Sequence, residues 1–487
     1  MKKYYILLAC IMVFTSCSDW LDVSSDSEVE KTELFKTEEG FIEALNGVYS
    51  RCTKSDIYGN ELTFGYLDVL AQNYTFSSDY LGYRETSEFN YSDPLFISRK
   101  DATWNGLYNA LSNCNLIIEN IDSKKSLFLN DNYKLVKGEA FALRAYLHFD
   151  LFRLFAPSYV TNPDAEAIPY ITSFSVKVTS QYTVKEVLEK IIADLNTAKL
   201  LLEDVDPILS DFYKVGYEDD ENTAENEGIL FLQNRRHRLN YYGVCASLAR
   251  AYLCLGNNAE ALNNALEVIN SEKFPWAKKE DVTEPDLTKR DRILYTELIF
   301  SWYIPTANIS LRQSFENGTA SLVTNFSQGN AIFEVNGVGA DDLRYKNWLA
   351  KATDGISEYL QLVKYHREED ENKHELLAPA IRLSEMYYIA AEATFDSNPA
   401  EAWGYFNTVR RNRGIGTEIS DESSSEEFKS ELIKECRKEF FGEGQVFYMY
   451  KRLNRDIVGH SGVTIPADNK IFVLPLPNDE MEFGQRN

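Results

Sequence analysis

The side chains that most often perform catalysis are present in this sequence, but they form no recognisable catalytic pattern. None of the five histidines lies in an H-E-x-x-H motif, and no G-x-S-x-G motif occurs. Gly337 and Gly339 lack the third glycine of a dinucleotide-binding loop. Asp and Glu, 75 in all, are so numerous that sequence spacing cannot select a glycosidase pair. We therefore expect a protein that is not an enzyme. The histidines are His148, His237, His366, His374 and His460.

The cysteines show no arrangement that would hold a metal ion or form a disulfide framework. Of the seven, Cys10 lies in an apolar N-terminal segment and Cys17 follows that segment. The others form no C-x-x-C pair, and most lie in apolar helical patterns, where a free thiol usually acts as a small buried side chain. We expect no disulfide, no metal site and no cofactor. These cysteines are Cys52, Cys114, Cys245, Cys254 and Cys436.

Two segments combine many aromatic side chains with weak periodicity, and they are candidates for a ligand-binding surface. The first covers residues 58–100, in which Gly59, Gly65, Gly82 and Pro94 interrupt any regular pattern. The second covers residues 271–351. Loops carried by a rigid scaffold are where binding residues concentrate. Most of the 64 aromatic residues must nevertheless pack in the core, so the sequence alone does not assign a binding role to any one of them.

The N-terminus carries its own chemistry, because it has the features of an export signal. Lys2 and Lys3 precede an apolar run over residues 4–14, which would form a helix of roughly 16 Å, too short for a bilayer core of about 30 Å. The run ends on Phe14-Thr15-Ser16-Cys17, which resembles a bacterial lipoprotein cleavage site. We expect a signal peptide over residues 1–16, a lipid on Cys17 and a polar tether over residues 17–36. The alternative is an ordinary secretory cleavage beside a chance cysteine.

Charge argues against nucleic acid as a partner. The chain of 487 residues has 50 Lys and Arg against 75 Asp and Glu, a net charge of -25, so its overall field repels polyanions. The basic run at residues 235–238 is short and isolated. We interpret that run as the solvated start of a helix. With 44% hydrophobic residues, the chain can bury a large core.

Apolar periodicity predicts that helices position these segments. Helices are expected over residues 37–52, 101–121, 132–155 and 183–202. The helix at 132–155 carries one continuous apolar stripe and ends before Pro157. In the last of these helices, Thr183 and Glu186 have the spacing of a capping box.

Two helical hairpins share one pattern of small residues. Residues 241–269 and 382–413 each contain two apolar helical stretches, separated by Gly256-Asn257-Asn258 in the first and by Asn398-Pro399 in the second. Small and apolar residues recur at matching offsets, as in tetratricopeptide repeats, whose paired helices approach closely and pack on their neighbours. Both copies lack the consensus Trp, Gly and final Pro, so two ordinary hairpins remain the alternative.

Five motifs in fixed order resemble the SusD/RagB family over nearly the whole mature chain. They are CSDWLD (17–22), GEAFALRAYLHFDLFRLFAP (138–157), RLSEMYYIAAEA (382–393), ECRKEFFGEGQVFYMYKR (435–452) and LPLPNDE (474–480). The sequence departs from the family pattern at Tyr448-Met449-Tyr450, where an acidic residue is more common. We expect this departure to alter local packing only.

The resemblance implies a mostly α fold, a tetratricopeptide-like helical repeat scaffold with long irregular insertions. It implies one SusD-like domain over residues 37–487, with an N-terminal part at about 37–230 and a C-terminal part at about 290–487. Such proteins are lipoproteins of the bacterial outer membrane that face the cell exterior. They capture glycans for a partner TonB-dependent, SusC-like transporter and are not catalysts. The alternatives are a RagB-like peptide receptor and a scaffold that binds only its transporter.

In family terms the two aromatic segments project from the same side of the scaffold, so we expect one shallow site built from both. Trp302 or Tyr83 is the expected stacking platform, and Asp79 and Arg84 are the expected hydrogen-bonding groups. The predicted ligand-binding residues are Asp79, Tyr80, Tyr83, Arg84, Trp302 and Tyr303.

Overall fold

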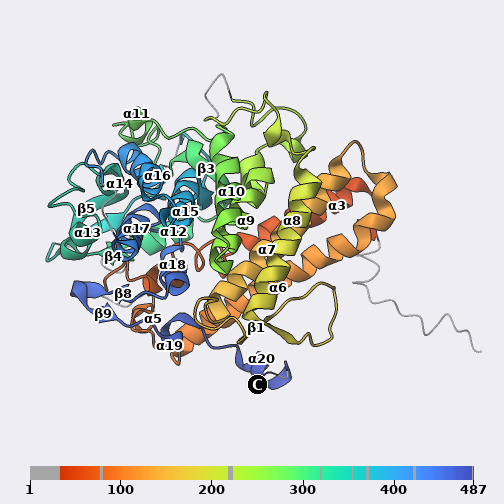
Figure 1. The fold of residues 1–487 in the computed structure, drawn as a ribbon, viewed down its shortest axis with the longest axis horizontal. Helices are drawn as coiled ribbons and strands as arrows, with labels where there is room; N and C mark the ends of the chain where they lie inside the picture. Colours follow the sequence, from red (N-terminus) through yellow and green to blue (C-terminus); the bar gives the residue numbers. More distant parts are fainter. Residues whose placement is uncertain are drawn as a thin grey trace, which may run out of the picture.

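The computed structural model describes residues 33–76, 80–217, 223–318, 321–353, 355–368, 372–419, 424–484 and 486. Helices dominate these residues, and the strands are short (Figure 1). The predicted signal peptide, Cys17 and Asp79 lie outside the described residues. Figure 1 places the long helices of residues 94–202 on one side of the molecule and the short strands β4 (Val323–Thr324), β5 (Leu349–Thr353), β8 (Ile457–Val458) and β9 (Thr464–Ile465) on the other.

Four long helices form most of the N-terminal part among the described residues. They are α3 (Glu38–Cys52), α6 (Pro94–Ile121), α7 (Asn132–Phe155) and α8 (Val184–Leu202). Side-chain caps begin three of them, α3, α6 and α8. Thr37 caps α3 by accepting a hydrogen bond from the Gly40 amide, and the predicted Thr183 capping box begins α8. The expected helices are confirmed, except that α6 starts earlier than predicted, because Asp93 caps it and proline fits the first turn.

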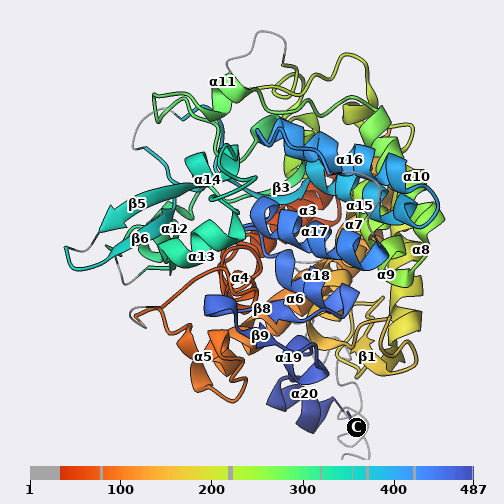
Figure 2. The ribbon, with the colours of Figure 1, turned by 60° about the vertical axis from the view of Figure 1, so that its left-hand side comes forward.

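The two predicted helical hairpins are present. The first joins α9 (Tyr241–Leu255) to α10 (Asn258–Asn270), and Gly256 ends α9 with a φ of 77°. The second joins α15 (Leu383–Phe395) to α16 (Pro399–Asn412). The hairpins pack on each other through α10 and α15, while α9 packs on α8. The result is the expected row of tetratricopeptide-like helices, which Figure 2 shows from another side.

The remaining elements are short, except for α17 (Ser425–Glu439). The helices are α4 (Tyr66–Leu70), α5 (Arg84–Ser87), α11 (Lys279–Val282), α12 (Asn308–Phe315), α13 (Phe326–Ile332), α14 (Leu343–Trp348), α17 (Ser425–Glu439), α18 (Val446–Leu453), α19 (Asn469–Phe472) and α20 (Asn478–Phe483). The 3₁₀ turns are η2 (Asp122–Leu127), η3 (Pro207–Leu209), η4 (Leu230–Leu232), η5 (Arg235–His237), η6 (Tyr295–Glu297) and η8 (His460–Gly462).

The strands form four small antiparallel sheets among the described residues. One of them, β3 paired with β7, lies next to α9 and α15 and joins the second aromatic segment to the start of the second hairpin. The order of the largest is β4-β6-β5. The strands are β1 (Glu166–Pro169), β2 (Gln181–Thr183), β3 (Leu298–Tyr303), β4 (Val323–Thr324), β5 (Leu349–Thr353), β6 (Glu358–Leu362), β7 (Leu377–Arg382), β8 (Ile457–Val458) and β9 (Thr464–Ile465).

A buried ionic network holds the C-terminal part together at Glu439, the last residue of α17. Its carboxylate accepts hydrogen bonds from Arg413 at 2.7 Å and 2.9 Å, from Arg344 at 2.9 Å, and from Arg382. These four side chains are almost completely buried. The three guanidinium groups outweigh the cost of burial and hold the pKa of Glu439 well below its usual value. One carboxylate thus links α14, β7, the end of α16 and α17.

The basic run at residues 235–238 is part of a second buried network, so its interpretation as a solvated helix start is wrong. Arg235 is fully buried and contacts Glu139 at 2.8 Å and Asp206 at 2.9 Å. Arg236 is also buried and pairs with Glu225. All of these acidic partners lie outside the basic run, so the run alone could not predict them.

We predict that Glu439→Gln lowers the free energy of unfolding by about 3–5 kcal/mol, because it leaves buried guanidinium charge uncompensated. Chemical denaturation of the mature chain, followed by circular dichroism, measures this change. Glu418→Gln is the control, since Glu418 is about half exposed and pairs with Arg411 at the surface, a contact worth about 0–1 kcal/mol. Equal effects of the two substitutions would contradict the structural role assigned to the network.

Candidate ligand-binding site

Trp302 lies in the core and cannot be the exposed stacking platform that the sequence predicts. Its side chain is 1% exposed and stacks on Tyr58, with ring centroids 4.2 Å apart. Tyr146 of α7 and Phe300 meet its edge at 5.8 Å and 4.7 Å. The prediction is wrong because β3 pairs with β7 and places Trp302 on the face covered by α3 and α7.

Tyr83 is also a packing residue. It is 4% exposed, and its hydroxyl lies 3.1 Å from both carboxylate oxygens of Glu61. The guanidinium of Arg99 lies over the ring, 4.0 Å from its centroid. Burial raises the pKa of Glu61, and Arg99 opposes that shift. The Tyr83 ring and hydroxyl are therefore both occupied by internal contacts.

Of the other predicted residues, the described ones are Tyr80, Arg84 and Tyr303, which lie at the surface but do not form one site. Tyr80 is 74% exposed, and Arg84 is exposed at the start of α5. Tyr303 is 40% exposed and stacks on His237, with centroids 5.2 Å apart. Figures 1 and 2 place α5 and β3 well apart. The structure therefore does not bring the described members of the two groups into one shallow site.

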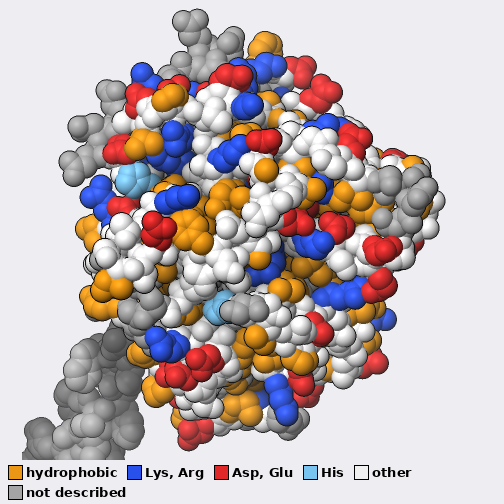
Figure 3. All heavy atoms as spheres, turned by 90° about the vertical axis from the view of Figure 1, so that its left-hand side faces the viewer, with side chains coloured by type: hydrophobic (Ala, Val, Ile, Leu, Met, Phe, Trp, Pro, Cys, Tyr) orange, Lys and Arg blue, Asp and Glu red, His pale blue; other side chains and the backbone are white. Residues whose placement is uncertain are grey.

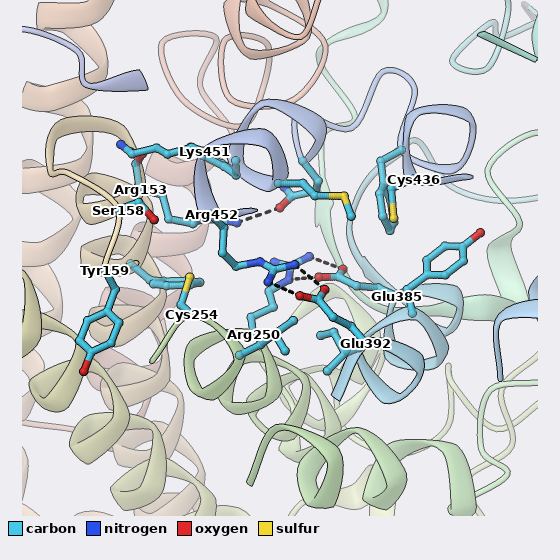
Figure 4. A pocket seen from close by; sticks show the side chains of 18 of the residues that line it. Arg153, Ser158, Tyr159, Arg250, Cys254, Glu385, Glu392, Cys436, Lys451 and Arg452 are labelled. Carbon is cyan, nitrogen blue, oxygen red and sulfur yellow. Dashed lines mark hydrogen bonds and ion pairs between the residues drawn. The ribbon is translucent and has the colours of Figure 1, made fainter. Parts of the chain in front are cut away.

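A small pocket lies where α7, α9, α15, α17 and α18 converge (Figure 4). Figure 4 shows Arg250, Arg452, Glu385 and Glu392 gathered at its centre. Arg250 pairs with Glu385, and Arg452 donates two hydrogen bonds of 2.6 Å to Glu392. The apolar side chains that surround these pairs are Phe149, Phe152, Leu253, Ile389, Leu432, Phe440 and Met449.

This pocket is too small to hold an oligosaccharide, and its charged side chains already pair with one another. Its volume is about 100 Å³, less than an apolar cavity of about 150 Å³ that admits benzene. Lys451 lines it and donates to the Arg153 carbonyl at 2.6 Å, and burial lowers the pKa of Lys451 to about 7. Burial raises the pKa of the Cys436 thiol well above its usual value, so this thiol is a poor nucleophile.

A larger groove, of about 550 Å³, lies between α13, α17, the end of α18 and the η8 turn. Figure 3 shows the face that carries α13, β8 and β9, where acidic, basic and apolar side chains are interspersed. The groove is lined by Gln328, Ala331, Ile332, Glu334, Ser430, Ile433, Lys434, Arg437, Tyr450, Asn454, Arg455, Asp456, Val458, Gly459 and Gly462.

The groove offers the chemical groups that a saccharide requires. Asn454 and Asp456 can exchange hydrogen bonds with sugar hydroxyls. Ile332 and Val458 provide apolar contact for the C–H faces of a sugar ring. Sequence analysis missed most of this groove, because α17 and α18 lie outside the two aromatic segments. Two signals pointed to parts of it: the second aromatic segment contains α13, and the motif at residues 435–452 contributes Arg437 and Tyr450.

The described residues were searched for metal-binding clusters and for membrane-spanning helices. Within the described ranges, no group of three or more His, Cys, Asp or Glu side chains is placed to hold a metal ion. Within the same ranges, no helix combines the length and apolar character needed to cross a membrane.

Comparisons with known proteins agree with the resemblance seen in the sequence. A family model described as "Starch-binding associating with outer membrane" matches residues 19–214, and a model of the "SusD family" matches residues 210–470. No match was found among curated proteins.

Solved structures share the fold over nearly their full length. A SusD superfamily protein from Bacteroides thetaiotaomicron is 22% identical, with a TM-score of 0.73 over 92% of this chain and 98% of that one. A putative sugar binding protein from Bacteroides vulgatus is 23% identical, with a TM-score of 0.70 over 92% and 96%. A SusD-like carbohydrate binding protein from the same species is 19% identical, with a TM-score of 0.73 over 92% and 97%.

We predict a large effect on stability at one aromatic position and almost none at another. Trp302→Ala should lower the free energy of unfolding by about 3–5 kcal/mol, because it empties a packed core site. Tyr80→Ala should change it by no more than about 0.5 kcal/mol, because the side chain is mostly exposed. Thermal and urea unfolding of both variants measure the difference. A Trp302→Ala variant as stable as the parent would show that Trp302 does not pack as described.

Proposed function

Because the chain belongs to the SusD/RagB family, we propose that it captures oligosaccharides at the cell surface and delivers them to a partner TonB-dependent transporter. Membership of this family indicates a carbohydrate-binding protein associated with the outer membrane. The groove between α13, α17 and η8 is the observation that supports a glycan site in this chain. Its volume of about 550 Å³ falls within the range of about 300–1,000 Å³ that is usual for ligand sites.

The groove suits capture followed by release. Its side chains come from α13, α17, the end of α18 and residues 454–462. The ionic network fixes α17, and α13 and α18 pack on α17. A binding surface that is already formed loses little conformational entropy when a sugar arrives. Open access at the surface allows the sugar to leave toward a transporter. Tyr80, Arg84 and Tyr303 are exposed and remain proposed secondary contacts for a long glycan, and so does Asp79.

Lipidation at Cys17 would hold the protein at the membrane while it exchanges ligand with its partner. The sequence between Cys17 and residue 33, where the described residues begin, is polar. Acyl chains contribute about 0.8 kcal/mol per buried methylene, and lasting attachment requires more than one chain. Cys17 would therefore need to carry more than one chain. The transporter partner is proposed from the family.

We predict that the soluble mature chain binds oligosaccharides and that Ser430→Trp weakens this binding at least about tenfold, because an indole would fill the groove. Ser430 is exposed on α17, so the substitution removes no core side chain. Lys429→Trp is the control, because it adds the same side chain to the same helix, but beside a different surface pocket. The measurement is calorimetry on hits from a glycan array, with a peptide library screened in parallel.

Three outcomes would contradict this proposal. Binding of peptides without glycans would favour a RagB-like peptide receptor. Binding of neither class would favour a scaffold that contacts only its transporter. Equal weakening by Ser430→Trp and Lys429→Trp would place the glycan outside the groove.

We predict that Cys17→Ala releases the protein from the membrane, because no acyl chain can then be attached. Fractionation of cells that lack the partner transporter measures the distribution, and the parent chain in the same cells is the control. Retention of the variant in the membrane fraction of those cells would contradict lipid anchoring at Cys17.

A further inference from the structure

Arg437 is a buried cation without a carboxylate partner at the floor of the groove. It lies on α17 and is 7% exposed. Its Nη2 donates to the Gln72 carbonyl at 3.2 Å, while its Nε makes no hydrogen bond. No carboxylate among the described residues lies within ion-pair distance of Arg437. This guanidinium, on a residue that lines the groove, therefore keeps an unsatisfied donor and a charge that no carboxylate neutralises.

The neighbouring cations show that the missing partner is specific to Arg437. On the same helix, Lys438 contacts Glu334 at 2.5 Å and Glu435 at 2.8 Å, and Lys434 contacts Glu431 at 2.6 Å. Arg455, across the groove, pairs with Glu426. Each of these charges is neutralised within the protein.

An unpaired buried charge is costly, because it loses its hydration and gains no Coulombic attraction from a charged partner. A cost of this kind is common at binding sites, where the ligand supplies the missing partner. Tyr450 adds a second unused group, since its hydroxyl is buried, lines the same groove and has no hydrogen-bond partner. A guanidinium and a hydroxyl from two residues that line one groove can bind an anionic group and a sugar hydroxyl of the same ligand.

The acidic side chains of the groove do not compensate Arg437. Glu334 is already paired with Lys438. Asp456 is exposed at the rim, and one of its oxygens accepts a hydrogen bond from the Ala467 amide at 2.9 Å. Water screens an exposed carboxylate strongly, so Asp456 opposes an incoming anion only weakly.

We propose that the groove selects saccharides that carry an anionic group, a carboxylate or a sulfate ester, and that Arg437 binds this group directly. This inference rests on the proposed glycan-binding function and names its substrate class. Guanidinium is well suited to the task, because its planar donors match the geometry of carboxylate and sulfate oxygens. Since the chain as a whole has a charge of -25, its general field would repel such a ligand. A local, buried arginine supplies the attraction that the overall charge does not.

The test measures the affinity of the soluble mature chain for three probes of equal length. These are a tetragalacturonate, a sulfated galactose tetrasaccharide of the carrageenan type, which carries sulfate esters and no carboxylate, and a neutral galactotetraose. Arg437→Gln should weaken the binding of at least one anionic probe about tenfold or more and leave the neutral probe unchanged. Arg455→Gln is the matched control, because it removes a groove cation that is already paired, and it should change affinity no more than about threefold. Comparison of the two anionic probes distinguishes a carboxylate from a sulfate ester.

A second measurement does not depend on whether the variants fold. In the parent chain, the affinity for the anionic probe should fall as sodium chloride rises from about 0.05 M to 0.5 M, while the affinity for the neutral probe should not. Equal salt dependence for both probes, or equal losses in Arg437→Gln and Arg455→Gln, would overturn the role of Arg437. Binding of the neutral probe alone would overturn the anionic class and leave the proposed glycan function intact. Failure to bind any of these probes or any other saccharide would overturn both.

Discussion

The contact between Glu439 and the guanidinium groups of Arg344, Arg382 and Arg413 is the interaction on which the C-terminal half depends. It joins residues that are 26 to 95 positions apart in the chain, and it is buried on all sides. The attraction within such a network does little more than offset the cost of desolvating its charges. Removal of one member, however, leaves an unpaired charge in the core. Its consequence here is geometric, because it fixes α17 against β7, α14 and α16. The other side of α17 then forms one wall of the groove.

The same network explains the chemistry of the motif at residues 435–452. Glu435 and Glu439 point into the network, and their pKa values are lowered, that of Glu435 to about 2. After α17 the chain turns through Gly442 and Gly444, whose amides donate to Asp68 of α4 at 2.5 Å and 3.0 Å. A Cβ at Gly444 would lie 2.4 Å from the Leu62 carbonyl oxygen, so only glycine fits there. The motif therefore connects the irregular N-terminal segment, the helical repeats and the groove.

Local signals in the sequence predicted local structure well. The apolar stripe of α7, the capping box at Thr183 and the paired hairpins all depend on residues a few positions apart. The burial of Trp302 depends instead on the pairing of β3 with β7, about 76 residues further along the chain, and on α3 and α7. No local pattern contains that information. The groove escaped prediction for the same reason, because its walls are elements from three separate stretches of sequence.

The central claim is that a saccharide binds in the groove between α13, α17 and η8. The most direct test is a crystal structure of the mature chain grown with an oligosaccharide that it binds in solution. The account predicts an ordered sugar in this groove, with a sugar oxygen or anionic group within hydrogen-bond distance of the Arg437 guanidinium. An ordered sugar bound elsewhere, for example beside Tyr80 or Tyr303, with none in the groove, would contradict it.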